Sequence, residues 1–402
     1  EKSAQAEKRT RGKRDEPEKV VIVGGGAAGF AAAEMLRRRQ YESGIVMLSS
    51  DDAPPVDRPN LSKDYLAGSA PEEWLPLRDQ SFYSDNAIDL RLNTTVAAID
   101  ARAREVSLTQ GNPIPFDRLL LATGAEPVAP SLPGARPSDV FVLRTLKDCR
   151  AIIERARMAK RVVVLGASFI GLEVAASLRA RNIEVHVVAP EDRPMERILG
   201  PDFSRLVQSI HEEHGVVFHW RETASGMEGK RVTLKGGSSL QADFIVAGLG
   251  VRPRLSLVEA AGLRIDRGVA VDAFLETSAP GIFAAGDIAR WPDRLTGEAI
   301  RVEHWVVAER QGQTAALNML GSHEPFDAVP FFWSQHYDVQ IAYVGHAEKW
   351  DDLAVEGDIG AKDGLVRMRR AGRTLAVASV FRDSESLEAE VDLERGARAG
   401  AA

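Results

Sequence analysis

Hydrophobic runs of strand length alternate with helix-like patterns through the first third of the chain. The β-branched run from Val20 to Val23 leads into a glycine-rich turn and then into small residues with helical spacing as far as Leu36. Further apolar runs at 45–50 and 119–121 are typical of strands in a parallel sheet. The pattern therefore predicts an α/β unit that begins with strand, tight turn and helix.

The turn after the first strand carries the spacing GxGxxG at Gly24, Gly26 and Gly29. Glycine is needed there for the tight turn, for close approach of a diphosphate to the backbone and for packing of helix on strand. The N-terminus of the helix offers unpaired N–H groups to the anion. One such motif is weak evidence for a dinucleotide site, so its recurrence matters.

A second copy of the motif lies in RVVVLGASFIGLEVAASL at 161–178, with Ser168 in place of the middle glycine. The segment at 119–127 likewise resembles the segment at 244–253. The repeats align Gly166 with Gly24, Gly171 with Gly29 and Gly250 with Gly124. The sequence therefore predicts two nucleotide-binding units, of which the first is longer because of a loop around 57–63.

That loop reads DRPNLSK and carries two cations, Arg58 and Lys63. Proline stiffens a loop, so held cations there suit a diphosphate and a reduced flavin, although a lone lysine is more often an ordinary exposed charge. In the second motif Glu173 sits among apolar residues, and a buried acid needs a partner. We expect that partner to be Lys63.

Acidic residues follow the second strand of each unit. In the first unit Asp51, with help from Ser50, is expected to bind the adenosine ribose, against the alternative of a surface acid in a turn. In the second unit the strand 184–189 ends at Ala189, where an NAD site usually has an acid. Glu191 and Arg193 follow. They leave the choice between NADH and NADPH open, with a lean to NADH.

Later elements are expected to return to the first unit. Residues 89–117 read as short strands and a hairpin, and the run GIFAAG ends in Asp287. Because that strand follows the closed second unit, we expect it to rejoin the first sheet, which makes the first domain discontinuous. The next segment, 301–320, reads as an amphipathic helix with Trp305 near its start, either a core residue or an aromatic cover for a flavin. Arg144 could contact a phosphate or lie exposed.

The remainder of the chain from residue 326 predicts a third, β-rich unit. Strands are expected in 330–345 and in 364–381, the latter a hairpin that turns at Ala371, and a short helix follows. Units of this kind commonly form a dimer or partner face.

Composition narrows the class of protein. The chain has 402 residues, 44% hydrophobic and 27% charged, with a net charge of −7, which argues against nonspecific nucleic-acid binding. No apolar run is long enough for a membrane span, and the single cysteine excludes a redox pair or a cysteine metal cluster, so we expect a cytoplasmic protein. Residues 1–18 read as a disordered tail or a linker to an upstream domain.

In sequence order the motifs GxGxxG, DRPxLSK, ATG, GxSFIGLE, GLGxRP, FAAGD, EHW and PFFWS resemble FAD-dependent pyridine-nucleotide reductases of the ferredoxin reductase and apoptosis-inducing-factor-like group. The resemblance implies an α/β fold of two Rossmann-like, glutathione-reductase-type domains plus a C-terminal α+β domain. It implies domains at 19–145 with 270–325 for FAD, 146–269 for NAD(P) and 326–402 at the C-terminus. No metal site is expected.

The resemblance also implies roles for individual residues. Lys63, Glu173 and Trp305 would act beside the flavin, the first two as an ion pair near its N5 atom. The implied FAD contacts are Gly24, Gly26, Ala28, Gly29, Ser50, Asp51, Arg58, Lys63, Val96, Thr123, Gly124, Arg144, Gly286, Asp287, Glu303, His304 and Trp305. The implied NAD(P)H contacts are Gly166, Ser168, Ile170, Gly171, Glu191, Arg193, Gly248 and Gly250.

The expected activity is hydride transfer from NADH to FAD, with electrons then released to an iron–sulfur protein of the ferredoxin or Rieske type. A Rieske module fused upstream is one form that this partner could take. Three alternatives stay open: reduction of a small acceptor such as a quinone, monodehydroascorbate or oxygen, an NADH-responsive redox sensor like apoptosis-inducing factor, and a non-catalytic dinucleotide-binding module. The absence of a dithiol excludes the disulfide reductase branch.

Overall fold

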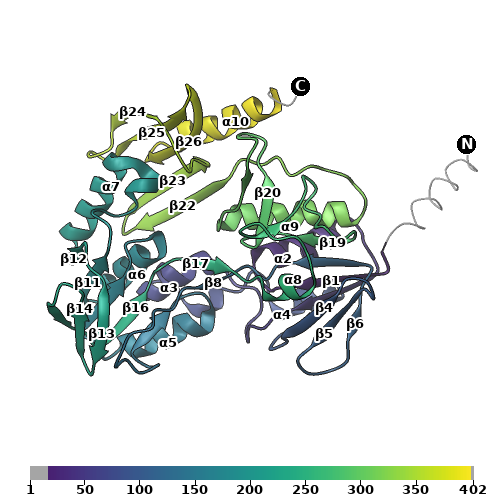
Figure 1. Cartoon of the computed structure of the whole chain (residues 1–402), viewed down its shortest axis with the longest axis horizontal. Helices are drawn as coiled ribbons and strands as arrows, with labels where there is room; N and C mark the ends of the chain where they lie inside the picture. Colours follow the sequence, from purple (N-terminus) through teal and green to yellow (C-terminus); the bar gives the residue numbers. More distant parts are fainter. Residues whose placement is uncertain (1–16, 400–402) are drawn as a thin grey trace, which may run out of the picture.

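Two parallel five-stranded sheets and one antiparallel five-stranded sheet organise the chain. Figure 1 shows the arrangement of the helices and strands. The structure is a computed structural model that describes residues 17–399. The tail expected at 1–18 therefore lies almost wholly outside the described residues. The expected α/β class with a separate C-terminal sheet is confirmed.

The first sheet is built around the N-terminal strand β1 and has the order β19-β7-β1-β2-β3. Its strands are β1 (Lys19–Val23), β2 (Gly44–Leu48), β3 (Ile88–Arg91), β7 (Arg118–Leu121) and β19 (Ile282–Ala284). All pair in parallel, and Phe283 of β19 lies opposite Leu120 of β7. The predicted return of the GIFAAG strand to the first sheet is therefore confirmed.

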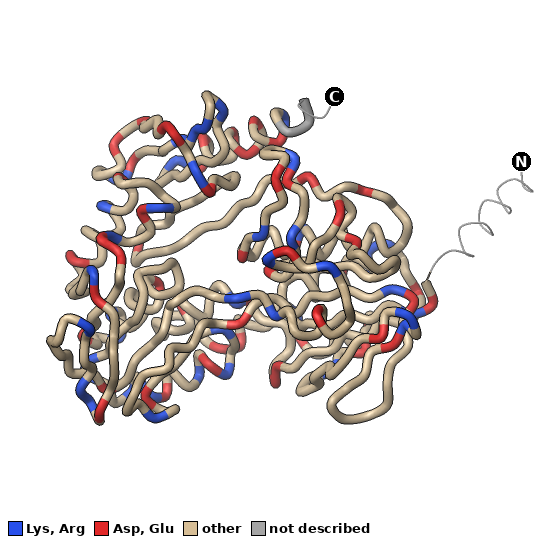
Figure 2. Tube along the Cα trace, viewed as in Figure 1, with Lys and Arg blue, Asp and Glu red and all other residues tan. Residues whose placement is uncertain are grey.

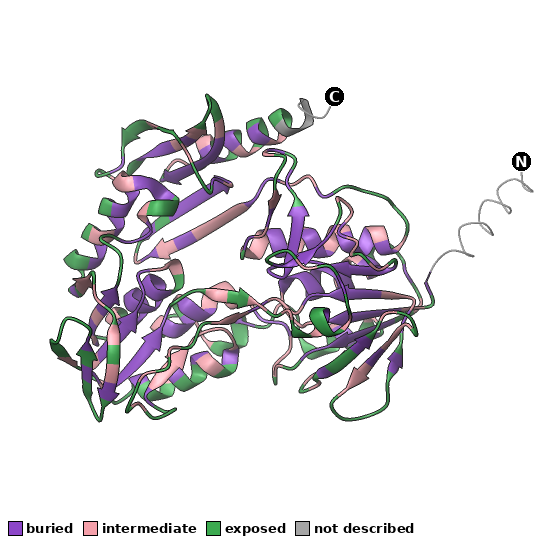
Figure 3. Cartoon of the chain, viewed as in Figure 1, coloured by how far each residue is buried: buried purple, intermediate pink, exposed green. Residues whose placement is uncertain are grey.

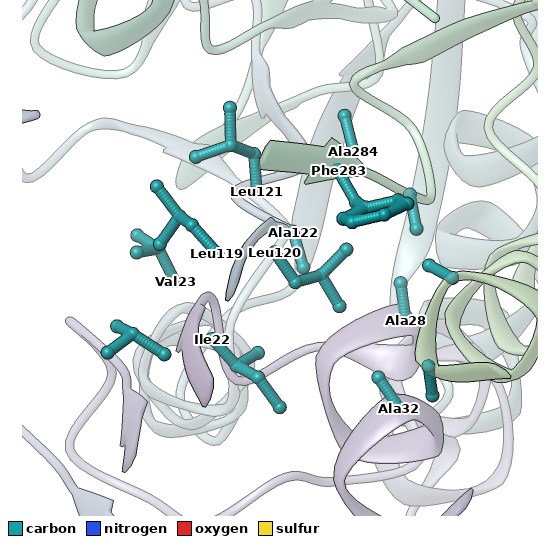
Figure 4. Packing of buried hydrophobic residues seen from close by; sticks show 14 of the residues in the cluster. Ile22, Val23, Ala28, Ala32, Leu119, Leu120, Leu121, Ala122, Phe283 and Ala284 are labelled. Carbon is teal, nitrogen blue, oxygen red and sulfur yellow. The ribbon is translucent and has the colours of Figure 1, made fainter. Parts of the chain in front are cut away.

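Helices α2 (Ala27–Arg38) and α9 (Trp305–Met319) pack together beside this sheet, on the side to which Phe283 and Leu120 point in Figure 4. Small residues let the two helices approach closely, since a Cβ added to Gly312 would lie 2.1 Å from the backbone oxygen of Ala28. The helix predicted at 301–320 begins at Trp305, and the residues just before it are not helical. This leaves them free to line a site.

The second sheet repeats the first, with the order β12-β11-β10-β16-β9 and only parallel pairs. Its strands are β9 (Val140–Val142), β10 (Arg161–Leu165), β11 (Glu184–Ala189), β12 (Val216–Trp220) and β16 (Phe244–Ala247), with helices α5 (Leu146–Ala156), α6 (Phe169–Ala180) and α7 (Glu196–Glu213). The repeat-related connectors β8 (Ala125–Pro127) and β17 (Val251–Pro253) pair with each other, so one antiparallel ribbon joins the two units.

The chain passes between the units earlier than predicted at both junctions. Strand β9 already belongs to the second sheet, ahead of the expected boundary at 145. On the return, Val258 and Leu263 pack into the hydrophobic core of the first unit, ahead of the expected boundary at 270.

Smaller elements complete the two units. They are η1 (Arg58–Ser62), α3 (Asp64–Ala67), η2 (Glu72–Trp74), α4 (Gln80–Asp85), β4 (Val96–Asp100), β5 (Glu105–Leu108), β6 (Ile114–Pro115), β13 (Ala224–Glu228), β14 (Arg231–Leu234), β15 (Ser239–Gln241), α8 (Ser256–Ala260), β18 (Val269–Ala270), β20 (Ala289–Pro292) and β21 (Ala299–Ile300). The predicted hairpin corresponds to β5 and β6. The loop predicted at 57–63 is largely η1, which fixes the positions of its cations.

The C-terminal unit is an antiparallel sheet of order β22-β23-β26-β25-β24 that helix α10 (Asp383–Ala399) covers. Its strands are β22 (Phe331–His336), β23 (Val339–Gly345), β24 (Asp352–Asp358), β25 (Asp363–Arg370) and β26 (Arg373–Val380). The predicted turn at Ala371 is confirmed. Strand β24 was not predicted, and it is largely exposed, as its mostly green and pink colour in Figure 3 shows.

Charges of both signs are interspersed over all three units, as Figure 2 shows. Among the described residues no helix combines the length and the apolar character that crossing a membrane requires.

Candidate functional site

The turn between β1 and α2 is shaped for a close ligand. A Cβ added to Gly24 would lie 2.1 Å from the backbone oxygen of Ala122, and one added to Gly29 would lie 2.0 Å from that of Gly24. Gly26 is different, since its nearest neighbour is the Arg58 guanidinium at 3.7 Å. It is also the N-cap of α2 and has no side chain to cap the helix. The first N–H groups of α2 therefore face open space, as an anion site requires.

Two arginine–carboxylate pairs lie beside this turn. Arg58 Nη2 is 2.8 Å from Asp51 Oδ2, and Arg144 Nη2 is 2.6 Å from Asp287 Oδ2. Burial lowers the pKa of Arg58, and the nearby Arg144 lowers it further. Two cations held close together at a helix N-terminus favour a polyanionic ligand such as a diphosphate. Arg144 therefore lines both cavities, whereas its contact with a phosphate stays a prediction.

The predicted partner of Glu173 is confirmed. Lys63 Nζ lies 2.8 Å from Glu173 Oε2, and only 3% of the glutamate side chain is exposed. Lys63 follows η1, while Glu173 lies in α6, so the ion pair joins the first unit to the second. Ser62 Oγ also donates to Glu173 Oε2, at 2.6 Å. A buried carboxylate keeps its charge only with such partners.

A cavity of about 720 Å³ contains this ion pair and is lined by all three units. The predicted residues on its wall are Gly26, Ala28, Arg58, Lys63, Gly124, Arg144, Ser168, Ile170, Glu173, Gly248, Gly250, Gly286, Asp287, Glu303, His304 and Trp305. A second cavity of about 370 Å³ shares Gly26, Arg58 and Arg144 with it and is further lined by Gly24, Ser50, Asp51, Val96 and Thr123. Together the cavities form an extended hollow along the N-terminus of α2.

The segment before α9 contributes both charge and aromatic surface. Arg301 Nη1 donates to the backbone oxygen of Asp287 at 2.9 Å and pairs with Glu303 at 2.5 Å. His304 lines the large cavity, and burial lowers its pKa to about 3, so its ring is neutral. Trp305 is half-buried, packs against the hydrophobic core of the first unit and also lines the large cavity. The two readings of this tryptophan, core and cofactor contact, are therefore compatible.

The second glycine turn is packed like the first but has a side chain that caps its helix. Neither Gly166 nor Gly171 has room for a side chain, because an added Cβ would lie 2.5 Å from the Gly248 oxygen and 2.3 Å from the Gly166 oxygen, respectively. Ser168 is the N-cap of α6: its hydroxyl accepts from the N–H of Gly171 at 3.2 Å and donates to the Gly248 oxygen at 2.7 Å. The serine therefore fixes the turn rather than only leaving space.

Glu191 and Arg193 lie outside both cavities. Both side chains are exposed just beyond the C-terminal end of β11. The neighbouring Asp192 pairs with Arg221 of the adjacent β12–β13 connection. The ends of parallel strands are where a dinucleotide's adenosine part binds, so the position suits a coenzyme contact.

Sequence reasoning missed the contribution of β22. Phe332 and Trp333 line the large cavity, and Ser334 Oγ donates to Glu173 Oε1 at 2.6 Å. The signal was present, because Ser334 and His336 are polar residues on the same strand face as Phe332 in an apolar strand. Polar residues on a buried face need partners, which indicates a network.

Residues 18–312 match the pyridine nucleotide-disulphide oxidoreductase family, and residues 331–402 match the reductase C-terminal family. The chain belongs to the pyridine nucleotide-disulphide oxidoreductase family. It is therefore an oxidoreductase with the FAD and NAD(H) cofactors of that family. The disulphide of the family name has no counterpart here, since the chain has one cysteine.

Several members of the pyridine nucleotide-disulphide oxidoreductase family resemble this chain closely. The ferredoxin–NAD(+) reductase component of the anthranilate 1,2-dioxygenase system of Burkholderia cepacia is 36% identical over 76% of this chain and 76% of its own length. Human apoptosis-inducing factor 3 is 34% identical over 82% of this chain, which spans only 55% of that protein. The covalent putidaredoxin reductase–putidaredoxin complex superposes with a TM-score of 0.89 at 33% identity, covering 94% of this chain and 93% of that chain.

Proposed function

We propose that this protein takes hydride from NADH onto FAD and passes the electrons to an iron–sulfur protein. The observation that carries the proposal is the Lys63–Glu173 ion pair inside the cavity between the two glycine turns. A relative that is named as a ferredoxin reductase component, and a structural neighbour that is captured with putidaredoxin, support this direction of electron flow.

The residues present fit FAD. The uncapped N-terminus of α2 with Arg58 and Arg144 would hold the diphosphate, and Asp51 with Ser50 would hold the ribose. Two buried polar atoms, Thr123 Oγ1 and Arg144 Nε, have no partner among the described residues, as expected beside a polar ligand. When bound, FAD supplies the exchange between two-electron and one-electron chemistry that no side chain offers.

The chain itself would supply charge and exclude water. Glu173 holds the Lys63 ammonium as a fixed positive charge in the cavity, where it would stabilise the negative charge of a reduced flavin bound beside it. Ile170, Phe332 and Trp333 line the same cavity with apolar surface. Low-dielectric walls of this kind strengthen the effect of a fixed charge.

The single cysteine of this sequence does not suit the role of electron acceptor. Cys149 is buried, its thiol donates to the backbone oxygen of Leu61, and burial raises its pKa to about 12. Such a thiol is inert in exchange chemistry.

The test is stopped-flow reduction of the bound flavin by NADH. Lys63→Ala should slow reduction about ten- to a hundredfold while FAD stays bound, whereas the exposed Lys349→Ala should match wild type. An unchanged rate in Lys63→Ala removes this lysine from the mechanism. Steady-state turnover with a ferredoxin, compared with ferricyanide and quinones, then tests the acceptor.

The likeness to apoptosis-inducing factor 3 favours one second candidate, an NADH-responsive redox sensor. That function would show slow turnover, a long-lived reduced flavin–nicotinamide charge-transfer band and a change in sedimentation on adding NADH. Fast turnover with a ferredoxin and unchanged sedimentation would exclude it.

Further features belong to this proposal. We propose an FAD-binding domain of 19–145 with 270–325, an NAD-binding domain of 146–269 and a C-terminal domain of 326–402, apart from the junction segments described above. NADH is the proposed coenzyme, with NADPH as the alternative. An upstream Rieske module, a homodimer and a cytoplasmic location remain predictions, which sedimentation and the upstream coding sequence would test.

A further inference from the structure

A buried hydrogen-bond chain runs from the ion pair into the C-terminal unit. Ser334 Oγ lies 2.6 Å from Glu173 Oε1, and His336 Nε2 lies 3.3 Å from the same hydroxyl. His211 Nε2 of α7 lies 3.1 Å from His336 Nδ1. Of these side chains, Ser334, His336 and His211 are 0% exposed. The series of hydrogen bonds thus runs from α6 through β22 to α7 and stays buried along its length.

The direction of the protons follows from the carboxylate at one end. An ionised carboxylate only accepts, so the Ser334 hydroxyl donates to it and must accept from His336 Nε2–H. His336 Nδ1 then carries a lone pair, which accepts from His211 Nε2–H. Burial lowers the pKa of His336 to about 4 and lowers that of His211 well below its usual value, so both rings are neutral.

The two carboxylate oxygens of Glu173 accept different numbers of hydrogen bonds. Oε2 accepts from Lys63 and Ser62, the groups that face it from the η1 segment. For Oε1, Ser334 is the donor that the described residues provide. A buried carboxylate oxygen without a donor strongly disfavours the charged form. Ser334 therefore supplies the hydrogen bond to Glu173 Oε1, an oxygen for which Lys63 provides no donor.

We propose that Ser334 and His336, backed by His211, are positioning residues that keep Glu173 ionised and turned toward Lys63. The proposal rests on the proposed function, in which the Lys63 charge assists hydride transfer. It gives the C-terminal unit a part in the redox site, because β22 supplies both positioning side chains. The unit would act through Glu173 and not by touching the cofactor with these groups.

The experiment follows the ionisation of Glu173 in the FAD-bound enzyme. The ¹³Cδ resonance of Glu173, assigned by its loss in Glu173→Gln, is titrated in wild type and in Ser334→Ala. Loss of a donor to the charged form should move the titration upward by about one pH unit or more, a tenfold or larger change. The midpoint potential of the bound flavin, measured against pH, should break at the same shifted pH.

Matched variants separate positioning from packing. Ser334→Thr keeps the hydroxyl and should restore the wild-type titration. Ser204→Ala removes an equally buried hydroxyl, whose 2.7 Å bond goes to the neutral Pro194 oxygen, and should leave Glu173 unchanged. His336→Leu, which leaves Ser334 in place, should shift the titration in the same direction but less, and it provides the test should Ser334→Ala fail to fold.

Superimposable titrations of wild type and Ser334→Ala, or of wild type and His336→Leu, would overturn the proposal. Neither readout uses an electron acceptor, so an error in the proposed iron–sulfur partner leaves the result unaffected. Conversely, a shifted Glu173 titration together with an unchanged reduction rate in Lys63→Ala would uphold the positioning while refuting the proposed mechanism.

Discussion

The two glycine turns share their backbone geometry but differ in what completes them. In the first, the N-cap of α2 is Gly26, without a capping side chain, and a ligand must satisfy the N–H groups. In the second, Ser168 caps α6 and bonds across to Gly248. A turn that depends on its ligand suits a permanent cofactor, whereas a self-satisfied turn suits a coenzyme that comes and goes at every cycle.

The charges around the turns differ in the same sense. Arg58 and Arg144 are only 23% and 22% exposed and are each paired with a carboxylate at the first turn. In the second unit Arg193 and Arg197, which follow β11, are exposed. Partly buried, positioned cations bind an anion more strongly than exposed ones, which solvent screens. The comparison therefore predicts tight FAD binding at the first site and weaker NADH binding at the second.

The largest effect should come from Gly24→Ala, compared with the equivalent Gly166→Ala. Gly24 has φ +126°, and its added Cβ meets the Ala122 oxygen, so we expect a loss of about 3 kcal/mol or more in the free energy of unfolding and a colourless protein. Gly166→Ala should be destabilised too but should keep FAD. The flavin-to-protein absorbance ratio and thermal unfolding measure both effects.

Gly229→Ala is the control for this pair. Gly229 also has a positive φ, +57°, but nothing lies within 4 Å of its added Cβ, so only the backbone cost of about 1 kcal/mol applies. Equal loss of FAD from Gly24→Ala and Gly166→Ala would break the division of roles between the turns.

A second pair of equivalent residues anchors the first strand of each unit. Asp117 accepts from the N–H groups of Glu18 and Lys19, each at 2.8 Å, and Asp243 accepts from those of Lys160 and Arg161 at 2.7 and 3.0 Å. Only Asp243 of the two is described with a lysine partner as well, Lys230 at 2.6 Å. The repeat therefore includes the aspartate that holds the start of the first strand, and in the second unit the ion pair with Lys230 strengthens this attachment.

Asp243→Asn should cost about 2 kcal/mol of stability at neutral pH. Burial alone would raise the pKa of Asp243, but the bonds from Lys230 and from the two backbone N–H groups outweigh it and lower the pKa to about 2. This stability is present above the unfolded-state pKa of 3.8 and is lost as pH falls toward 2. Asp117→Asn should cost about 1 kcal/mol, the value of ordinary hydrogen bonds. The free energy of unfolding, measured with denaturant between pH 2 and 7, is the test. An equal loss of stability in the two variants at every pH would contradict the stronger role of Asp243.

The doubled nucleotide unit could be predicted because its signals are local. Glycine spacing and strand-length apolar runs fixed the expected turns, and the return of the strand that contains Phe283 follows from its position after a closed sheet. The Lys63–Glu173 pair was predicted from one buried acid that needed a cation. In each case a backbone or burial requirement is visible within a few residues.

The rest of the site depends on contacts across long sequence separations. Ser334 reaches Glu173 from the C-terminal unit, and no local pattern fixes that register. The bond from Ser168 to Gly248 could not be predicted, because Gly248 follows the neighbouring strand β16 and is 80 residues away in the sequence. No residue of strand β24 is fully buried, so its sequence lacks the strong apolar run that marks a core strand. Tertiary packing, rather than propensity, decides such features.

Gly26→Ala and Ser168→Ala test the N-caps themselves, with effects near 1 kcal/mol. Space exists for a methyl group at Gly26, so the fold should tolerate the change while FAD affinity falls severalfold, because the diphosphate can no longer approach the backbone. Ser168→Ala should lower the free energy of unfolding by about 1 kcal/mol and leave FAD retention unchanged. Fluorescence of released FAD and thermal unfolding distinguish the two, and a reversed pattern would contradict the assignment of the turns.

The smallest effect is expected at Glu191 and Arg193 beyond β11, the residues that we propose influence the choice of coenzyme. Arg193→Ala should reduce use of NADPH a few-fold with little change for NADH, because an exposed arginine gains only a modest, salt-screened attraction to a 2′-phosphate. Glu191→Ala should do the opposite and remove repulsion of that phosphate. The ratio of kcat/KM for the two coenzymes, measured at low and high salt, is the test. If neither substitution changes the ratio, selection must lie within the turn itself, and the second site would then resemble the first more than its exposed charges indicate.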